Sequence, residues 1–123
     1  MITMMHVGKE TLIGDIQHEF NMLFPYLRIE FAKSDGKNAS DKKPEKLSPR
    51  LKFSAIASIP KEMDLDLDEN QKVAHVKKVF GGMGILALIY RQSGKVWIET
   101  SLTEDWSLKR QNDEGALFSP LYE

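Results

Sequence analysis

Three aspartates at alternate positions are the strongest candidates for chemistry in this sequence. Asp64, Asp66 and Asp68 lie in the segment MDLDLDEN, and carboxylate oxygens are ligands that calcium prefers. A calcium-binding loop starting at Asp64 would also need glycine at its sixth position and glutamate at its twelfth, where the chain has Glu69 and His75. The segment therefore does not match a calcium loop, and its aspartates are only weak candidates for a cation site.

The same segment fits a β-strand with one face in water. Met63, Leu65 and Leu67 alternate with the aspartates. A period of two places the apolar side chains on one face of a strand and the carboxylates on the other. Since a strand explains every residue without a bound ion, we predict a strand here and no metal site.

Other patterns associated with catalysis are incomplete. The run Gly81-Gly82-Met83-Gly84 follows a predicted helix, whereas the glycines of a phosphate-binding loop precede one. Asp15, His18 and Glu19 share one side of a predicted helix, but the spacing is not that of a helical zinc site. Because no nucleophile motif or acid–base pair is recognisable, we favour a protein that is not an enzyme and has no cofactor.

The composition is that of one ordinary globular domain. The chain has 123 residues, of which 41% are hydrophobic and 28% are charged, and it has no cysteine. We expect a single domain over residues 1–123, without disulfides or thiolate metal ligands. The N-terminus lacks the pattern of a signal peptide and no apolar run approaches the length of a membrane span, so we expect a cytoplasmic protein that does not insert into membranes.

One segment is more basic than the rest of the chain. Residues 33–52 carry seven basic and three acidic side chains, although the net charge of the chain is −1. The glycine, proline, serine and asparagine residues within residues 33–50 predict a mobile loop, whose charges would simply be solvated. The alternative is contact with nucleic acid or another polyanion. The residues that would make this contact are Lys42, Lys43, Lys46 and Arg50.

Hydrophobic periodicity predicts a mixture of helices and strands. Apolar side chains recur every three or four residues over residues 11–24, where Thr11 can cap the helix and Pro25 prevents its continuation. Asn70 is the predicted cap of a second helix, and Gly115 is the predicted end of a third. The predicted helices cover residues 11–24, 71–80 and 107–114. Either Ser48-Pro49 or Ser54 would begin a further short helical turn that runs through Ile59. The predicted strands cover residues 27–31, 63–67, 85–91 and 96–101.

Two parts of the chain share one order of elements. Residues 11–37 and 71–95 each read as a helix, a stop, a strand and a turn that ends in Gly-Lys. If the MDLDL strand completes the first half, the chain is helix-strand-strand written twice, with an insertion in the first hairpin. This pseudo-repeat predicts the α+β class, with a small, mainly antiparallel four-stranded sheet that carries two helices on one face.

The predicted strand from Ile85 to Tyr90 is apolar on both sides. Strands of this kind are usually covered on both faces. The two helices would cover one face, so the C-terminal segment or a second chain would have to cover the other. The C-terminal residues concerned are Leu117, Phe118, Leu121 and Tyr122.

Alternation along the last two strands predicts a surface on that second face. Trp97 and Glu99 share one side of their strand, and we expect Tyr90 of the neighbouring strand beside them. An uncovered apolar and aromatic patch marks an interface. We therefore predict an interaction module that uses Tyr90, Trp97 and Glu99 to form a homodimer or larger oligomer, or to bind another protein.

The segment SGKVWIETSLTEDWSLKRQNDEG resembles part of a family of small uncharacterised bacterial proteins of the α+β class, and DIQHEFNMLFPYL shows a fainter similarity. The resemblance implies a bacterial protein with a similar alternation of helices and strands. The lysine-rich insert and the run from Gly81 to Gly84 are not features of that family. No activity is attached to the family, so the resemblance implies no catalytic residue.

Overall fold

The strands of this protein form two antiparallel sheets. The computed structural model describes residues 3–33 and 45–119. The smaller sheet pairs β1 (Met4–Gly8) with β3 (Glu62–Asp66), and the larger has the order β2 (Leu27–Lys33), β4 (Ile85–Ser93), β5 (Val96–Glu99). The helices are α1 (Ile13–Leu23), α2 (Phe53–Ile56), α3 (Val73–Gly82) and α4 (Leu108–Phe118), with a 3₁₀ turn, η1, at Ser101–Thr103. The predicted α+β class is confirmed, but the prediction of one four-stranded sheet is wrong.

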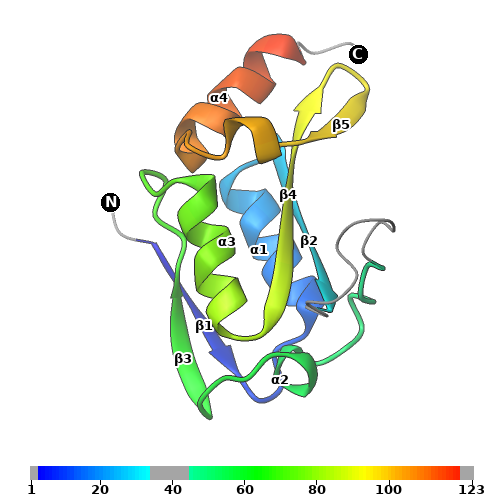
Figure 1. Cartoon of the computed structure of the whole chain (residues 1–123), viewed down its shortest axis with the longest axis vertical. Coiled ribbons are helices and arrows are strands. Elements are labelled where there is room, and N and C mark those ends of the chain that lie inside the picture. Colours follow the sequence, from blue (N-terminus) through cyan, green and yellow to red (C-terminus); the bar gives the residue numbers. More distant parts are fainter. Residues whose placement is uncertain (1–2, 34–44, 120–123) are drawn as a thin grey trace.

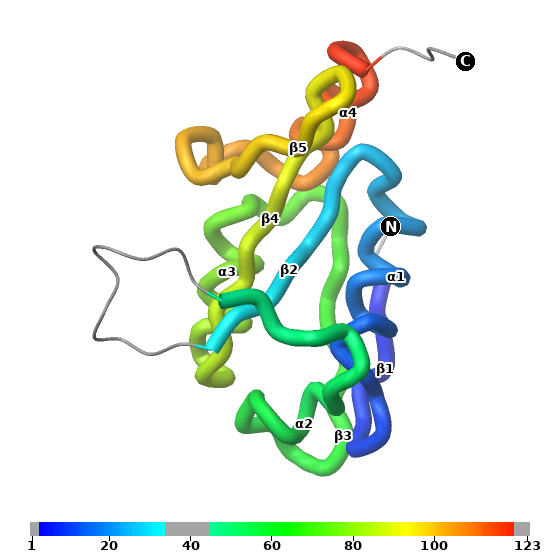
Figure 2. The backbone as a smooth tube through the Cα atoms, turned by 90° about the vertical axis from the view of Figure 1, so that its right-hand side faces the viewer, coloured from blue at the N-terminus to red at the C-terminus, as the bar shows by residue number. Residues whose placement is uncertain are grey.

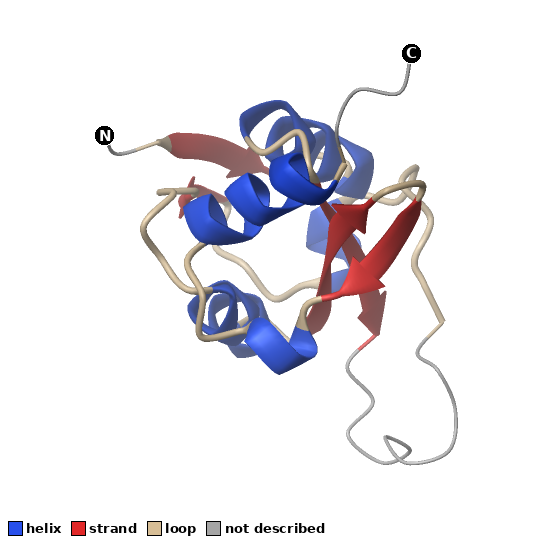
Figure 3. Ribbon diagram, turned by 90° about the horizontal axis from the view of Figure 1, so that it is seen from above, coloured by secondary structure: helices blue, strands red, loops and turns tan. Residues whose placement is uncertain are grey.

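One core joins the two sheets. α1 packs on β2 and α3 packs on β4, so both helices lie on the same face of the larger sheet (Figure 3). The β1–β3 pair lies on the far side of these helices (Figure 1). Alternation along each strand directs its apolar side chains toward the helices. Buried side chains from both sheets and both helices meet there, among them Val7, Ile16, Ile29, Leu65, Val76 and Ile89.

The chain contains two units of the order strand-helix-strand. The units are β1-α1-β2 and β3-α3-β4, and each strand pairs with its counterpart in the other unit. The MDLDL strand is therefore the first strand of the second half, and the prediction that it completes the first half is wrong. Its counterpart β1 was not predicted. Lys46 forms an isolated antiparallel β-bridge with Ala32 of β2. The segment around Lys46 therefore pairs with β2 as β5 pairs with β4, and is the first-half counterpart of β5.

The helix starts are joined in pairs by backbone hydrogen bonds. The bonds between α1 and α2 run from the Ile13 N–H to the Leu51 carbonyl (2.9 Å) and from the Phe53 N–H to the Thr11 carbonyl (2.8 Å). The bonds between α3 and α4 run from the Val73 N–H to the Trp106 carbonyl (3.0 Å) and from the Leu108 N–H to the Gln71 carbonyl (2.9 Å). The first N–H groups of a helix have no partner within the helix, so the neighbouring segments satisfy them here.

These bonds explain why two predicted helix caps are wrong. The residue types of Thr11 and Asn70 predict that these two residues are the caps. The structure has Leu12 and Lys72 as the caps of α1 and α3, and neither side chain makes a capping hydrogen bond. A side-chain acceptor is not required, because neighbouring carbonyls already accept the first N–H groups. The Thr11 hydroxyl instead accepts the Gly8 N–H at 2.9 Å.

Two glycines near the end of the chain act differently. Gly115 does not end α4 as predicted, because the helix continues to Phe118. A Cβ at Gly115 would lie 2.7 Å from the Cβ of Tyr26, so the missing side chain lets α4 approach the sheet. Gly94 has a φ of 65° and forms the turn between β4 and β5, which confirms the predicted hairpin.

Candidate functional site

The larger sheet carries a group of aromatic and charged side chains on the face opposite α1 and α3. The strand register pairs Arg28 with Tyr90, Tyr90 with Glu99 and Gln92 with Trp97. Cross-strand partners lie on the same face of a sheet. We call this surface the open face; it consists of Arg28, Glu30, Tyr90, Gln92, Trp97 and Glu99. The structure thus places the three predicted interaction residues on one surface.

Two cations lie over the aromatic rings of the open face. The Arg28 guanidinium carbon is 5.6 Å from the centre of the Trp97 ring, and the Lys46 ammonium is 4.8 Å from the centre of the Tyr90 ring. The Glu30 carboxylate accepts hydrogen bonds from Arg28 at 2.8 and 3.1 Å, which fixes the guanidinium. Contacts of this kind stabilise exposed rings by about 0.5–1 kcal/mol each. Both rings are therefore held in half-buried positions.

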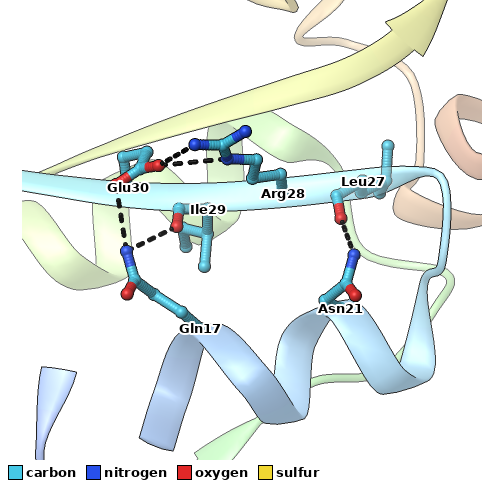
Figure 4. A network of polar contacts seen from close by, with 6 residues as sticks. All are labelled: Gln17, Asn21, Leu27, Arg28, Ile29 and Glu30. Carbon is cyan, nitrogen blue, oxygen red and sulfur yellow. Dashed lines mark hydrogen bonds and ion pairs between the residues drawn. The ribbon is translucent and has the colours of Figure 1, made fainter. Parts of the chain in front are cut away.

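α1 supports this surface from the outer edge of β2 (Figure 4). The Gln17 amide donates to the Ile29 carbonyl at 3.0 Å and to the Glu30 carboxylate at 3.1 Å. The Asn21 amide donates to the Leu27 carbonyl at 2.9 Å. These two carbonyls face away from β4, so the helix satisfies backbone groups that would otherwise need water. The same bonds fix Glu30, the partner of the arginine.

A described segment of the chain crosses one end of this side of the sheet. The segment that begins at residue 45 passes in front of the end of β2 (Figure 2). Ala32 and Leu88 are 0% and 8% exposed there. In the part of the chain that the structure describes, no segment crosses the other end, where β4 leads into β5 (Figure 2). Tyr90 and Trp97 lie on these two strands. This uncovered end is the one that contains the fixed aromatic rings.

The described part of the C-terminal segment does not cover the open face. Arg91 is bound to Gln111 of α4 at 2.9 Å, and Arg91 points to the opposite side of the sheet from Tyr90. Leu117 and Phe118 are 69% and 59% exposed. The other two residues predicted as a cover, Leu121 and Tyr122, lie outside the described residues. Of the two covers considered, the C-terminal segment or a second chain, the first is therefore not provided by Leu117 and Phe118.

The aspartates of MDLDLDEN lie on and just after β3, as the predicted strand requires. Asp64 and Asp66 are exposed on either side of the buried Leu65. Asp66 accepts the backbone N–H of Asp68 at 2.9 Å, and His6 of β1 lies 3.4 Å from Asp64. Among residues 3–33 and 45–119, no group of three or more histidine, aspartate or glutamate side chains is arranged to hold a metal ion.

The structure describes two of the four candidate polyanion residues, Lys46 and Arg50. Lys42 and Lys43 lie outside the described residues. Arg50 is exposed in the turn before α2, whereas Lys46 lies over the Tyr90 ring. Lys46 therefore belongs to the surroundings of the open face.

A hollow of about 600 Å³ lies beside the start of α1 and is open to solvent. Its lining includes His6, Thr11, Asp15 and Glu62. Two of these side chains already bind the backbone: the Asp15 carboxylate accepts the Leu12 N–H at 2.8 Å, and the Thr11 hydroxyl accepts a second backbone N–H. His6 and Glu62 are 3.2 Å apart and both exposed, so water competes for their contact. The hollow therefore has no enclosed group poised for catalysis.

The contacts of Arg28 and Lys46 with the aromatic rings were not predicted from the sequence. Arg28 alternates with Leu27 and Ile29, which indicates that it faces away from the core. That pattern could not show which strand lies beside it. Lys46 was considered only as part of the basic segment, because nothing local relates it to Tyr90.

Comparison with known proteins adds no function. No protein-family model matches the sequence, and no curated protein or solved structure is significantly similar to it. Within the described residues, no helix has the length and apolar character required to cross a bilayer. The open face is the best-defined candidate site, because its rings are fixed and its end around Trp97 is left uncovered by the described chain.

Proposed function

We propose that this protein is a non-catalytic interaction module that associates with a second copy of itself through the open face. One observation carries the proposal. The rings of Tyr90 and Trp97 are held by cations on a sheet backed by the core, at an end that no described segment crosses. The predicted interaction residues Tyr90, Trp97 and Glu99 belong to this surface, on β4 and β5.

The residue types of the open face suit protein binding. Tryptophan, tyrosine and arginine contribute most often to the binding energy of protein interfaces, and Trp97, Tyr90 and Arg28 supply all three. Arg28 is bonded to Glu30 and stacked on the Trp97 ring, so the rotamers of these side chains are restricted before binding. A restricted surface loses less conformational entropy when a partner binds.

The charges near the open face favour a second copy as the partner. Arg28 and Lys46 are positive, and Glu30 and Glu99 are negative. A surface with both signs can complement itself in a two-fold arrangement, because each cation can meet a carboxylate of the other copy.

The replacement Trp97→Ala tests the proposal. The wild-type chain is expected to form an oligomer between micromolar and millimolar concentrations in sedimentation and light-scattering experiments. Trp97→Ala should raise the dissociation constant roughly tenfold or more, because it removes a central aromatic anchor. Circular dichroism should show unchanged helix content, since Trp97 lies outside the helices and the core.

Leu102→Ala is the matched control. Leu102 is a large apolar residue that is 99% exposed and lies in η1, outside the open face. Its replacement should leave the oligomer unchanged. A wild-type monomer at every concentration, or a Trp97→Ala variant that assembles like the wild type, would overturn the proposal.

A further inference from the structure

We propose that the second copy joins along the outer edge of β5, so that two three-stranded sheets become one continuous antiparallel sheet. The inference rests on the proposed self-association, but it does not require the open face to be the contact surface; it names the strand edge along which the two copies join. It follows from a difference between the two edges of the larger sheet: the backbone at the β2 edge is hydrogen-bonded within the protein, whereas β5 has no described strand on its outer side.

The outer edge of β2 is occupied by the protein itself (Figure 4). The outward carbonyls of Leu27, Ile29 and Phe31 accept hydrogen bonds from the Asn21 amide, the Gln17 amide and the Leu47 N–H, at 2.9, 3.0 and 2.7 Å. Within the described residues, no strand lies on the outer side of β5. A second copy can therefore extend the sheet on one side only. Pairing of like edges produces a closed two-fold dimer instead of an open filament.

The outward backbone groups of β5 belong to Trp97 and Glu99. The Thr100 N–H donates to the Ile89 carbonyl at 3.1 Å, so Thr100 faces β4. Because backbone groups alternate in direction along a strand, Ile98 also faces β4, while Trp97 and Glu99 direct their N–H and C=O groups outward. No backbone hydrogen bond among the described residues uses these outward groups. Such an edge is a template for another strand.

Antiparallel pairing centred on Ile98 provides hydrogen-bond partners for the outward N–H and C=O groups of Trp97 and Glu99 in both copies. Trp97 of each copy then lies opposite Glu99 of the other, and each of these pairs exchanges both of its N–H···O bonds. Ile98, which is 37% exposed, meets the same residue of the second copy as an apolar pair. A register with Glu99 opposite Glu99 would place like charges together. A register centred on Trp97 would need Lys95, which precedes β5 in the turn.

A single introduced cysteine tests the register. The chain has no cysteine of its own, so Ile98→Cys provides one thiol per copy. Directly opposite residues of a non-hydrogen-bonded antiparallel pair have Cα atoms about 4.5 Å apart, which is within the range of a disulfide. Mild oxidation should therefore produce a covalent dimer of Ile98→Cys roughly tenfold faster than of the exposed control Leu102→Cys.

A proline at position 99 tests the backbone contact. Glu99→Pro removes an N–H that faces away from β4, so it leaves the bonds between β4 and β5 intact. It should raise the dissociation constant of the dimer about tenfold, since two interchain hydrogen bonds are lost. Glu99→Gln also removes the charge but keeps the N–H, so the comparison of the two variants isolates the backbone contact: the Glu99→Pro dimer should have a dissociation constant about tenfold higher than that of the Glu99→Gln dimer.

The outcomes separate this inference from the proposed function. A dimer that weakens in Trp97→Ala, yet does not cross-link at position 98 and is equally stable in Glu99→Pro and Glu99→Gln, overturns edge pairing and supports association through the open face. Cross-linking at position 98 with loss of the dimer in Glu99→Pro supports edge pairing, even if Trp97→Ala assembles normally and the role of the open face is overturned. A monomer at every concentration overturns both.

Discussion

The two halves of the molecule share a backbone arrangement but differ at the sheet edges. In the first half, Gln17 and Asn21 of α1 bond to the edge of β2. Counted from the first residue of each helix, the corresponding residues of α3 are Lys77 and Gly81. Lys77 bonds to Glu104 at 3.1 Å, and a glycine has no side chain to donate. The second half instead ends its sheet with β5, whose outer side carries no described strand.

This difference shows which features a repeated unit must keep. Both halves retain the backbone bonds between helix starts and the buried residues at the first position of each helix, Ile13 and Val73. Both also retain a buried phenylalanine near the helix end, Phe20 and Phe80. These features stabilise the fold. The exposed side chains around the larger sheet are free to differ. Among the described residues, the second half contributes the aromatic rings of the open face and the edge of this sheet that has no partner strand.

The largest expected effect comes from the residues that begin α2 and α4. Phe53 and Leu108 are corresponding residues and are 1% and 0% exposed. Because Phe53 packs edge-on against Phe31 and Phe80 and α2 is only four residues long, Phe53→Ala should lower the free energy of unfolding by about 3–5 kcal/mol. Leu108→Ala should cost about 2–4 kcal/mol, since α4 has further contacts with the sheet. Urea denaturation measures both free energies of unfolding. If Phe53→Ala lowers the free energy of unfolding less than Leu108→Ala does, then α2 does not depend on its first residue more strongly than α4 does.

Two glycine replacements test the close packing of α4 on the sheet. The counterpart α2 is only four residues long and contains no glycine. Gly115→Ala should lower the free energy of unfolding by about 1–3 kcal/mol, because the new Cβ would lie 2.7 Å from that of Tyr26. Gly81→Ala is the control within α3. Nothing lies within 4 Å of its added Cβ, so it should stabilise the protein by up to about 1 kcal/mol. Equal changes in thermal unfolding would contradict the close approach of α4 to the sheet.

The smallest expected effect concerns the helix caps. Ser107 accepts the Arg110 N–H at 3.0 Å, so Ser107→Ala should lower the free energy of unfolding by about 1 kcal/mol. Its counterpart Lys52 makes no capping bond, and its ion pair with Glu10 is exposed. Lys52→Ala should therefore change stability by less than about 0.5 kcal/mol. If both variants unfold at the same urea concentration, the serine cap does not distinguish the two halves.

Local patterns in the sequence predicted several elements of the fold. The spacing of apolar residues predicted α1 and α3, and a last helix was assigned near α4 with Gly115 as its end. Alternation predicted β2, β3 and β5, and β4 was predicted as a strand that is apolar on both sides. β1 was missed because it offers little alternation, with only Met5 and Val7 turned toward the core. The pairing of strands was wrong because it depends on contacts between residues far apart in the chain, which local periodicity does not contain.

The candidate site divides in the same way. Tyr90, Trp97 and Glu99 could be assigned to one face because a short turn fixes the register of β4 and β5. Arg28 and Lys46 come from segments distant in the chain, so their positions over the rings required the structure. The state of the sheet edges also required it, because Gln17 and Asn21 give no sign in the sequence that their amides bond to β2.

The exchange of strands between the units has a consequence for folding. Every strand of β1-α1-β2 finds its hydrogen-bonding partner in β3-α3-β4, so neither unit contains a complete sheet. One unit alone would expose unpaired backbone and half of a core. We therefore expect unfolding to be a single cooperative transition, without a populated intermediate in which one unit remains native.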